Sequence, residues 1–419
     1  MTDRSHARAL DAADGLAGFR ERFAIAEDGP IYLDGNSLGR LPLATRDRLR
    51  DVAGEWGQRL VGGWSEWIDL PRRAGDLLAE GVLGGRAGEV LVCDSTTVNL
   101  HKLCSAALDA YALSAQRAVV TDRGNFPTDR YVLEGLCAQR GLELRTFEAD
   151  ELLGPRPEDL DAALADGSAA LVVLSHVAYR SGALADLPAL TEVARRHDAH
   201  VVWDLSHSAG ALPVDLHEAG VELAVGCSYK YLNAGPGAPA WLYVAEAVQD
   251  RLRSPIWGWF GQEDQFAMER DYVPARGIDR FAAGTPSVLG VAAVEEGARV
   301  TAEAGIAALR EKSVAQTELV VALHDAWLEP LGFSLGTPRE PARRGSHVSL
   351  RHEQARPICR ALIERAGVIA DFRGPDSIRL GVAPLYTSFT EVWDALDRLR
   401  ALVEAGEHQL VDATRGRIT

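Results

Sequence analysis

The stretch Gly226-Cys-Ser-Tyr-Lys-Tyr-Leu-Asn-Ala-Gly-Pro-Gly237 decides the fold, because it places Lys230 after a short apolar segment and before a glycine- and proline-rich turn. Residues 223–225 are apolar and predict a strand, and open α/β sheets bind their ligands at strand ends. Lysine side chains are normally solvated. A partly desolvated lysine has a lowered pKa, and its neutral amine can form a Schiff base with a carbonyl group. The stretch therefore predicts a Schiff-base lysine at the edge of a sheet.

A carboxylate upstream of this lysine indicates which Schiff-base cofactor the site could bind. Ala199-His-Val-Val-Trp-Asp204 predicts a strand that ends in Asp204, and His207 follows three residues later. A lysine for the aldehyde and an aspartate for the pyridinium nitrogen are what pyridoxal 5'-phosphate (PLP) requires. His207 could reach the phenolic oxygen of the ring. The alternatives are a helix N-cap for Asp204 and an ordinary polar contact for His207.

The composition is that of an ordinary globular protein. The chain has 419 residues, of which 47% are hydrophobic and 25% charged, enough for a substantial core and two domains. Its net charge of -16 argues against nonspecific binding to nucleic acid or to anionic membranes. The five scattered cysteines include no C-x-x-C pair, which argues against a disulfide framework and a structural zinc ion. Because the sequence shows neither a signal-peptide core nor a membrane-spanning run, we expect a cytoplasmic protein.

Short apolar runs alternate with longer amphipathic stretches along most of the chain. Strands are predicted at residues 90–93, 117–121, 169–174, 200–203, 223–225 and 240–244, and helices at 99–113, 129–140, 157–164 and 187–197. This alternation predicts an α/β fold with a mainly parallel sheet covered on both faces. We expect a large domain over residues 71–290 and a smaller α+β domain over 291–419. The N-terminal segment, residues 1–70, is expected to pack with the small domain.

Further motifs follow predicted strands, so their polar side chains should meet at the sheet edge of Lys230. In Asp94-Ser-Thr-Thr-Val-Asn-Leu100, Thr96 and Thr97 could hold a phosphate group, and a simple helix N-cap is the alternative. In Asn125-Phe-Pro-Thr-Asp129, Phe126 could lie against a flat ring, and Asp129 could face a cofactor cation or cap a helix. Ser175 directly follows the apolar run at 169–174, so its hydroxyl group should lie at the same edge.

Taken in order, these motifs resemble those of the kynureninase family. The resemblance rests on them together with Tyr32-Leu-Asp-Gly-Asn-Ser-Leu-Gly39, Asp204-Leu-Ser-His207, Cys227-Ser-Tyr-Lys-Tyr-Leu-Asn-Ala-Gly235, Gly258-Trp-Phe-Gly261 and Ile378-Arg-Leu-Gly-Val-Ala-Pro-Leu-Tyr386. They cover most of the chain. The resemblance implies a fold-type-I PLP enzyme of the aminotransferase class V-like superfamily, normally a homodimer with active sites at the subunit interface.

Roles for individual residues follow from the same resemblance. It implies that Lys230 forms the Schiff base, Asp204 pairs with the pyridinium nitrogen and Phe126 stacks on the ring. The residues implied around the cofactor and its phosphate are Thr96, Thr97, Phe126, Pro127, Thr128, Asp129, Ser175, Asp204, His207, Tyr229, Lys230, Trp259 and Thr285. The partner subunit is expected to supply Trp259 and Thr285. Arg379 would bind the substrate α-carboxylate through its forked donors, and a surface ion pair is its alternative. Ser37 and Trp64 would line the aryl pocket, where Trp64 and Thr285 favour plain kynurenine over its 3-hydroxy form.

The implied reaction is hydrolysis of L-kynurenine, or 3-hydroxy-L-kynurenine, to anthranilate, or 3-hydroxyanthranilate, and L-alanine. It belongs to the kynurenine pathway of tryptophan catabolism and NAD biosynthesis. Lys230 would remove the α-proton, and Tyr229 is a candidate proton donor. A cysteine desulfurase-like enzyme is one alternative, but the only cysteine beyond Lys230 is Cys359, in a helix-like stretch. The other alternative is a PLP-binding protein without turnover, for which no DNA-binding appendage or basic face is present.

Overall fold

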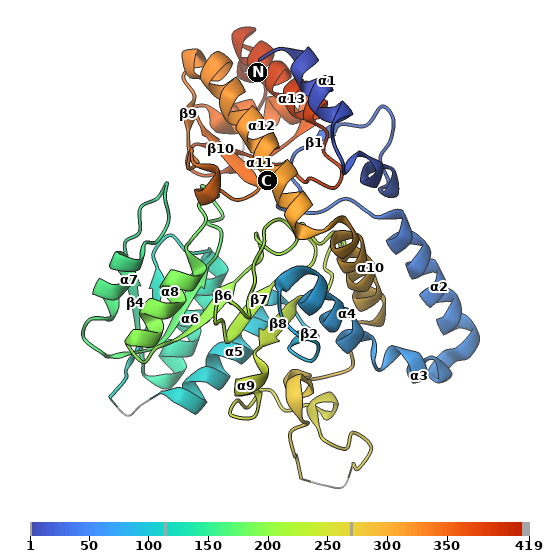
Figure 1. Cartoon of the computed structure of the whole chain (residues 1–419), viewed down its shortest axis with the longest axis vertical. Helices are drawn as coiled ribbons and strands as arrows, with labels where there is room; N and C mark the ends of the chain where they lie inside the picture. Colours follow the sequence, from blue (N-terminus) through green and yellow to red (C-terminus); the bar gives the residue numbers. More distant parts are fainter. Residues whose placement is uncertain (1, 113–114, 269–270, 413–419) are drawn as a thin grey trace.

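Seven strands form the central sheet, in the order β2-β8-β7-β6-β5-β3-β4 (Figure 1). The structure is a computed structural model that describes residues 2–112, 115–268 and 271–412. The strands are β2 (Val90–Val92), β3 (Ala118–Asp122), β4 (Glu143–Phe147), β5 (Ala169–Ser175), β6 (His200–Asp204), β7 (Leu223–Gly226) and β8 (Trp241–Val244). Within this sheet β8 runs antiparallel to the other six strands, which are parallel to one another. The predicted α/β fold with a mainly parallel sheet is confirmed.

Helices cover both faces of this sheet. They include α4 (Leu70–Leu78), α5 (Thr96–Tyr111), α6 (Pro127–Arg140), α7 (Pro157–Leu164), α8 (Leu187–Arg196) and α10 (Val288–Ala304). Alternate residues of β5 point to opposite faces, since Val172 packs in the core with α8 whereas Leu171 packs in the core with α5. The four predicted helices are confirmed, and their observed ends differ from the predicted ones by a few residues at most. Leu113, the predicted end of α5, lies outside the described residues.

A second, antiparallel sheet lies over the carboxyl ends of β5 and β6. Its order is β12-β13-β10-β9, with β9 (Ser334–Leu335), β10 (His347–Arg351), β12 (Asp371–Arg373) and β13 (Ser377–Gly381). The helices α11 (Ile306–Leu323), α12 (Ala355–Glu364) and α13 (Phe389–Glu404) share a separate hydrophobic core with it. We refer to this sheet and these helices as the small body.

The N-terminal segment contacts both parts of the molecule. Helix α1 (Arg4–Ala12) packs on α13, where Arg4 and Asp394 form an ion pair of 2.6 Å, and β1 (Ile31–Tyr32) pairs with β11 (Val368–Ile369). Helix α2 (Leu43–Arg59) instead packs along α10, beside the central sheet. The domain division at residues 70 and 290 therefore stays a prediction.

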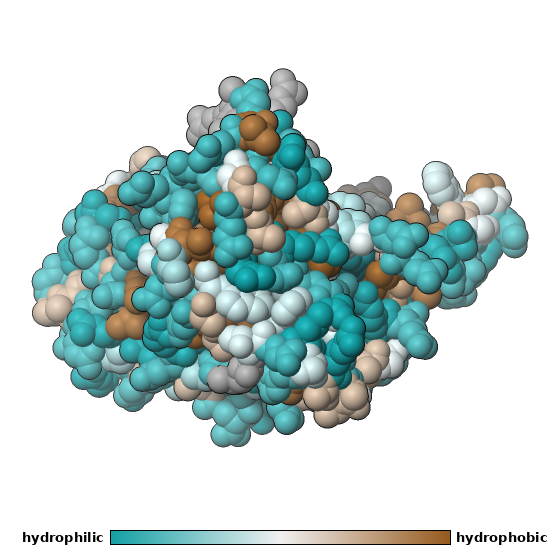
Figure 2. Space-filling view, turned by 90° about the horizontal axis from the view of Figure 1, so that it is seen from above, coloured by the Kyte–Doolittle hydropathy of each residue, from teal (hydrophilic) through white to brown (hydrophobic). Residues whose placement is uncertain are grey.

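An arm projects from the side of the molecule (Figures 1 and 2). It consists of α2, the turn η2 (Leu60–Gly63) and α3 (Trp64–Trp67). Large apolar side chains on it are exposed, namely Trp56 by 61%, Leu60 by 63% and Val61 by 82%. Apolar side chains in such numbers on one projection are typical of a surface that another protein covers.

The loop after β5, residues 178–184, is hydrogen-bonded to the small body along most of its length. The amide of Leu184 donates to the Arg343 carbonyl at 2.9 Å, and the Gly345 amide donates to the Gly182 carbonyl at 2.8 Å. The Ser349 hydroxyl donates to the Arg180 carbonyl. These bonds fix the small body above the strand ends at which Lys230 is expected. Among the helices of the described residues, none is long and apolar enough to cross a membrane.

Candidate active site

Lys230 lies at the carboxyl edge of the central sheet, four residues after β7 ends at Gly226. Neighbouring strands bring the other predicted residues to this edge, because Ser175 is the register partner of Asp204 in β6. The segment before α2 closes over the lysine loop, where the Gly39 amide donates to the Tyr229 carbonyl at 2.7 Å. A β-carbon at position 39 would lie 2.4 Å from the Lys230 carbonyl oxygen, so only glycine allows this approach.

Two buried carboxyl groups lie together beside Lys230. Burial, and then the adjacent Asp204 carboxylate, raise the pKa of Asp129 well above its usual range. Asp204 accepts the Ser206 amide at 2.8 Å. Within the described residues, Oδ2 of Asp129 has no hydrogen-bond partner. Asp129 is therefore a carboxyl group that holds its proton to a higher pH than an ordinary aspartate does.

The helix-cap alternatives for these two aspartates are not supported. No helix of the described residues begins at Asp204, whose carboxylate instead closes a turn onto Ser206. Helix α6 has Phe126 as its N-cap residue, followed by Pro127 and Thr128 in its first turn, and no side-chain cap bond forms there. Asp129 lies in that first turn with its carboxyl group turned toward Asp204.

Two aromatic side chains, Phe126 and Tyr179, lie beside the lysine amine. The Nζ atom of Lys230 lies 6.0 Å from the ring centroid of Phe126, and Tyr179 meets Phe126 edge-on at 5.3 Å. Asn125 sets the position of Phe126, because its Oδ1 accepts both the Phe126 amide at 2.8 Å and the Ser175 hydroxyl at 2.6 Å. Phe126 is 37% exposed, so its ring is accessible for stacking.

Two buried imidazoles complete this side of the site. The ring of His207 lies 5.6 Å from the ring of His347, a small-body residue that sequence reasoning missed. Burial, followed by the charge of Lys230, lowers the pKa of His207 well below its usual value, so the ring is neutral. In the described part of the chain, its Nε2 has no hydrogen-bond partner. A neutral imidazole can meet a phenolic oxygen there as donor or acceptor, according to its tautomer.

Tyr229 lies next to the Cys227 thiol. The neighbouring Cys227 side chain, and then burial, raise the pKa of the Tyr229 hydroxyl. The phenol is therefore protonated at neutral pH and able to donate a proton.

Arg379 reaches the site from β13 and is almost completely buried. Its Nε and Nη2 atoms contact the two carboxylate oxygens of Asp371, its cross-strand neighbour, at 3.1 and 2.5 Å. Nη2 also donates to the Ser37 hydroxyl at 3.0 Å, and Nη1 to the Tyr179 carbonyl at 2.6 Å. The structure thus joins the predicted substrate-binding residues Arg379 and Ser37, and the surface ion pair considered for Arg379 is instead a buried one.

Helix α5 presents the predicted phosphate turn. Ser95 is the N-cap residue, and its hydroxyl accepts the Val98 amide at 3.4 Å, so neither Thr96 nor Thr97 supplies the side-chain cap. Thr96 is half-buried and Thr97 is exposed. An open helix N-terminus with two hydroxyl groups suits an anion.

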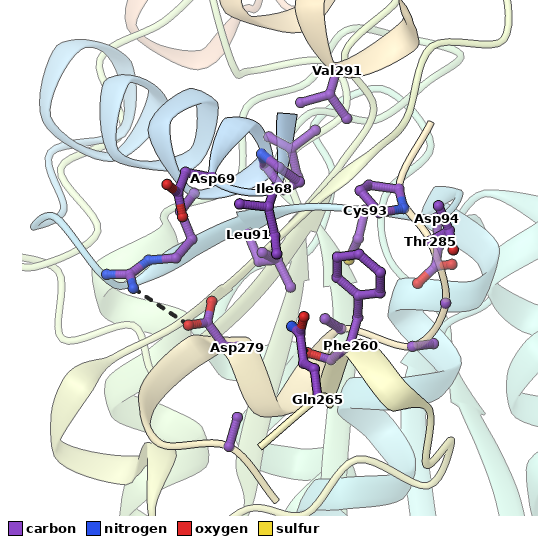
Figure 3. A pocket seen from close by; sticks show the side chains of 18 of the residues that line it. Ile68, Asp69, Leu91, Cys93, Asp94, Phe260, Gln265, Asp279, Thr285 and Val291 are labelled. Atoms are coloured by element: carbon purple, nitrogen blue, oxygen red, sulfur yellow. Dashed lines mark hydrogen bonds and ion pairs between the residues drawn. The ribbon is translucent and has the colours of Figure 1, made fainter. Parts of the chain in front are cut away.

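Trp64, Trp259 and Thr285 form a separate group. Trp64 and Trp259 both pack against Phe260, with ring centroids 6.1 and 4.5 Å away. Phe260 and Thr285 line a cavity of about 680 Å³, together with Cys93 and Asp94 (Figure 3). Between described side chains, no hydrogen bond, ion pair or ring contact joins this group to the residues around Lys230. A single copy of the chain therefore presents the predicted site residues as two groups that no such contact joins.

The residues around Lys230 fit PLP. Among the described residues, the buried Nε2 atom of His207 has no hydrogen-bond partner and could bond to the phenolic oxygen of the ring. The carboxylate of Asp204 and the face of Phe126 match the charge and shape of a pyridinium ring.

Comparison with known proteins identifies the family. A model of the kynureninase C-terminal domain matches residues 309–399. The kynureninase of Pseudomonas fluorescens is 46% identical over 411 residues, 96% of each chain. The kynureninase of Burkholderia pseudomallei is 43% identical over the full length of both chains. The chain belongs to the kynureninase family. The resemblance detected in the sequence motifs is confirmed.

Solved structures of more distant proteins share the fold of this family member. The cysteine desulfurase of Thermococcus onnurineus NA1 superposes with a TM-score of 0.79 at 19% identity, covering 93% of this chain and 98% of its own. A C-DES mutant with glycine covalently linked to its PLP cofactor gives 0.79 at 20% identity, covering 91% and 98%. At such low identity the likeness concerns the fold alone. Cys359, the only candidate for a desulfurase nucleophile, is buried in α12, and burial raises its pKa to about 12.

Proposed function

We propose that the chain is a PLP-dependent hydrolase that converts L-kynurenine, or 3-hydroxy-L-kynurenine, to anthranilate, or 3-hydroxyanthranilate, and L-alanine. The observation that carries this proposal is the kynureninase match over the whole chain. The cluster of Lys230, Asp204, Asp129 and Phe126 supports it, because these side chains meet at one sheet edge.

Cofactor binding is assigned to the residues of this edge. Lys230 holds the aldehyde carbon, Asp204 faces the ring nitrogen, and Phe126 covers one ring face. Thr96 and Thr97 bind the phosphate group, with Ser175, Pro127 and Thr128 nearby. Bound PLP supplies an electron sink for the negative charge that develops at the substrate α-carbon.

The protein residues supply binding and proton transfer. Arg379 and Ser37 bind the α-carboxylate, and Asp371, bonded to the Nε and Nη2 atoms of Arg379, holds the guanidinium group in place beside Ser37. The Lys230 amine removes the α-proton, and Tyr229, which burial and Cys227 keep protonated, returns a proton to carbon. Water adds to the substrate γ-carbonyl, and cleavage of the Cβ–Cγ bond releases the aromatic acid and leaves the electron pair on Cβ, which takes up a proton before L-alanine leaves.

The two separate groups of site residues support a homodimer with shared active sites. Trp259 is 41% exposed and lies outside the Lys230 cluster, and the apolar arm around Trp56 and Val61 offers a surface for a second copy. In this arrangement Trp259 and Thr285 enter the partner's site, and Trp64 borders the aryl pocket. Mixing Lys230→Ala with Trp259→Ala protein tests it, because a mixed dimer has one intact site. Recovery of activity on mixing two inactive proteins is expected, and no recovery would argue against shared sites.

Reaction products test the function directly. Incubation with kynurenine and with 3-hydroxykynurenine should release the corresponding anthranilates, and Trp64 and Thr285 favour the first substrate. Absence of product from both would defeat the proposal and favour a PLP-binding protein without turnover. A visible absorbance band that survives Lys230→Ala would overturn the Schiff-base assignment. We further place the enzyme in the cytoplasm and in tryptophan catabolism, in keeping with its free cysteines.

A further inference from the structure

A buried lysine lies directly behind the phosphate turn. The side chain of Lys102, on α5, is completely inaccessible to solvent. Its Nζ donates to Oδ2 of Asp94 at 2.7 Å, to the Phe281 carbonyl at 2.6 Å and to Sγ of Cys93 at 3.5 Å. An ammonium group has three donors, so all of them are used. Burial alone would lower the pKa of Lys102, but Cys93 and Asp94 more than offset it and keep the amine charged.

The acceptors of Lys102 come from two segments far apart in the sequence. Cys93 and Asp94 form the turn that leads into Ser95, Thr96 and Thr97, and Asp94 adopts a left-handed backbone with φ of 47°. Such a conformation is strained for an aspartate and has to be held by its surroundings. Lys102 supplies part of that restraint through its 2.7 Å ion pair.

The third acceptor, Phe281, begins the segment that carries Thr285. This segment packs closely against the turn of Trp259, since the Phe260 amide donates to the Ala283 carbonyl at 3.2 Å. A β-carbon at Gly258 would lie 2.0 Å from the same carbonyl oxygen, so only glycine allows the two segments to pack this closely. Asp94 and Thr285 line the same cavity, and Figure 3 shows them on one side of it.

We propose that Lys102 is a positioning residue that ties the phosphate turn, residues 93–97, to the segment 281–285, so that phosphate binding at the turn also orders the segment bearing Thr285. The inference rests on the proposed PLP site and adds a link between its two groups of residues. If Thr285 contributes to the partner's active site, Lys102 connects the cofactor-binding turn of one active site to a residue that lines the other active site.

The test compares two buried lysines. Lys312 also forms a 2.7 Å ion pair with an aspartate, Asp14, and is 7% exposed, but it lies on α11 and joins that helix to the N-terminal segment. Lys102→Met and Lys312→Met should lower the melting temperature of the full-length apoprotein to a similar degree. Only Lys102→Met should also weaken PLP binding, by ~10-fold or more in Kd, because a charged hydrogen-bond network behind the turn is lost.

Hydrogen–deuterium exchange measures the link itself. In the wild type, addition of PLP should slow amide exchange both in residues 93–104 and in residues 281–287. In Lys102→Met, at saturating PLP, the first segment should still respond and the second should not. Lys312→Met should behave as the wild type does.

Asp94→Asn provides a second variant if Lys102→Met does not fold, because it removes the charge of the pair and leaves the lysine in place. It should show the same loss of response in residues 281–287, to a smaller degree. The proposal would be overturned if PLP still slowed amide exchange in residues 281–287 of both variants. If Lys102→Met does not fold, the same result in Asp94→Asn alone would overturn it. The PLP-binding assignment would stand in either case. A wild type that binds no PLP would instead overturn the proposed function.

Discussion

Replacement of aspartate by asparagine should have a small effect on the cofactor site at Asp129 and a large effect on catalysis at Asp204. Asp129 holds its proton to a higher pH than an ordinary aspartate does, because its carboxyl is buried, faces Asp204 and has an oxygen without a partner within the described residues. Asparagine reproduces a protonated aspartic acid in shape and keeps a donor. Asp129→Asn should therefore change the PLP affinity by less than about 1 kcal/mol. It should raise the free energy of unfolding at neutral pH, because the wild type, unlike the variant, takes up a proton at this position on folding.

Asp204→Asn removes the negative charge itself. A hydrogen bond to a charged group contributes about 1.5–3 kcal/mol, which corresponds to roughly 10- to 150-fold in an equilibrium or rate constant. We expect a loss of that size in kcat, because the charge stabilises the protonated ring nitrogen when negative charge develops at the substrate. Loss of Asp204 also removes the repulsion that raises the pKa of Asp129.

The assay is a comparison of the two variants with the wild type. PLP binding to apoprotein is followed by absorbance, and kcat and KM for kynurenine are followed by release of anthranilate. Urea unfolding at several pH values gives the stability. Because the pKa of Asp129 is raised in the folded state, the free energy of unfolding of the wild type should fall as the pH rises through that pKa. In Asp129→Asn this contribution to the pH dependence should be absent. Equal losses of kcat in the two variants would refute the assignment of the proton to Asp129.

Three further changes have separate readouts. Burial lowers the pKa of His176 to about 4, so the wild type should lose about 3 kcal/mol relative to His176→Phe as the pH falls from 6.5 to 4; parallel stability curves in urea would contradict this. Burial and Asp371 raise the pKa of Asp34 to about 6, so Asp34→Asn should gain up to about 3 kcal/mol relative to the wild type as the pH rises from 4 to 8, measured by the same unfolding series. Arg379→Lys keeps the charge but loses the fork, so KM for kynurenine should rise by ~10-fold or more with a smaller change in kcat; an unchanged KM would remove Arg379 from substrate binding.

Strands could be predicted where both of their faces are buried, because such a strand appears in the sequence as an uninterrupted run of apolar residues. Strand β5 is such a run, and its predicted end at residue 174 differs by one residue from the observed Ser175. Strand β4 was not predicted, because it lies at the sheet edge and only Phe147 among its residues is buried. Its sequence, Glu-Leu-Arg-Thr-Phe, therefore carries no comparable apolar signal.

The residues that follow strand ends were predictable because the topology brings them to one edge. The supporting residues were not. Asp371, His347 and Lys102 approach the site from other strands or from behind a helix, and each is an unremarkable polar residue in its local sequence. Only the three-dimensional arrangement shows that Asp371 orients Arg379 or that Lys102 spans two distant segments.

The bonding of residues 178–184 to the small body has a consequence for recombination between relatives. In a chimera that takes its central sheet from one kynureninase and its small body from another, this loop would come from the wrong parent. Leu184 and Arg180 would then have to find their backbone and hydroxyl partners on foreign surfaces around Arg343 and Ser349. A chimera whose crossover points follow sequence position alone would separate the loop from its partners. A chimera that takes residues 178–184 from the same parent as the small body would keep these hydrogen bonds.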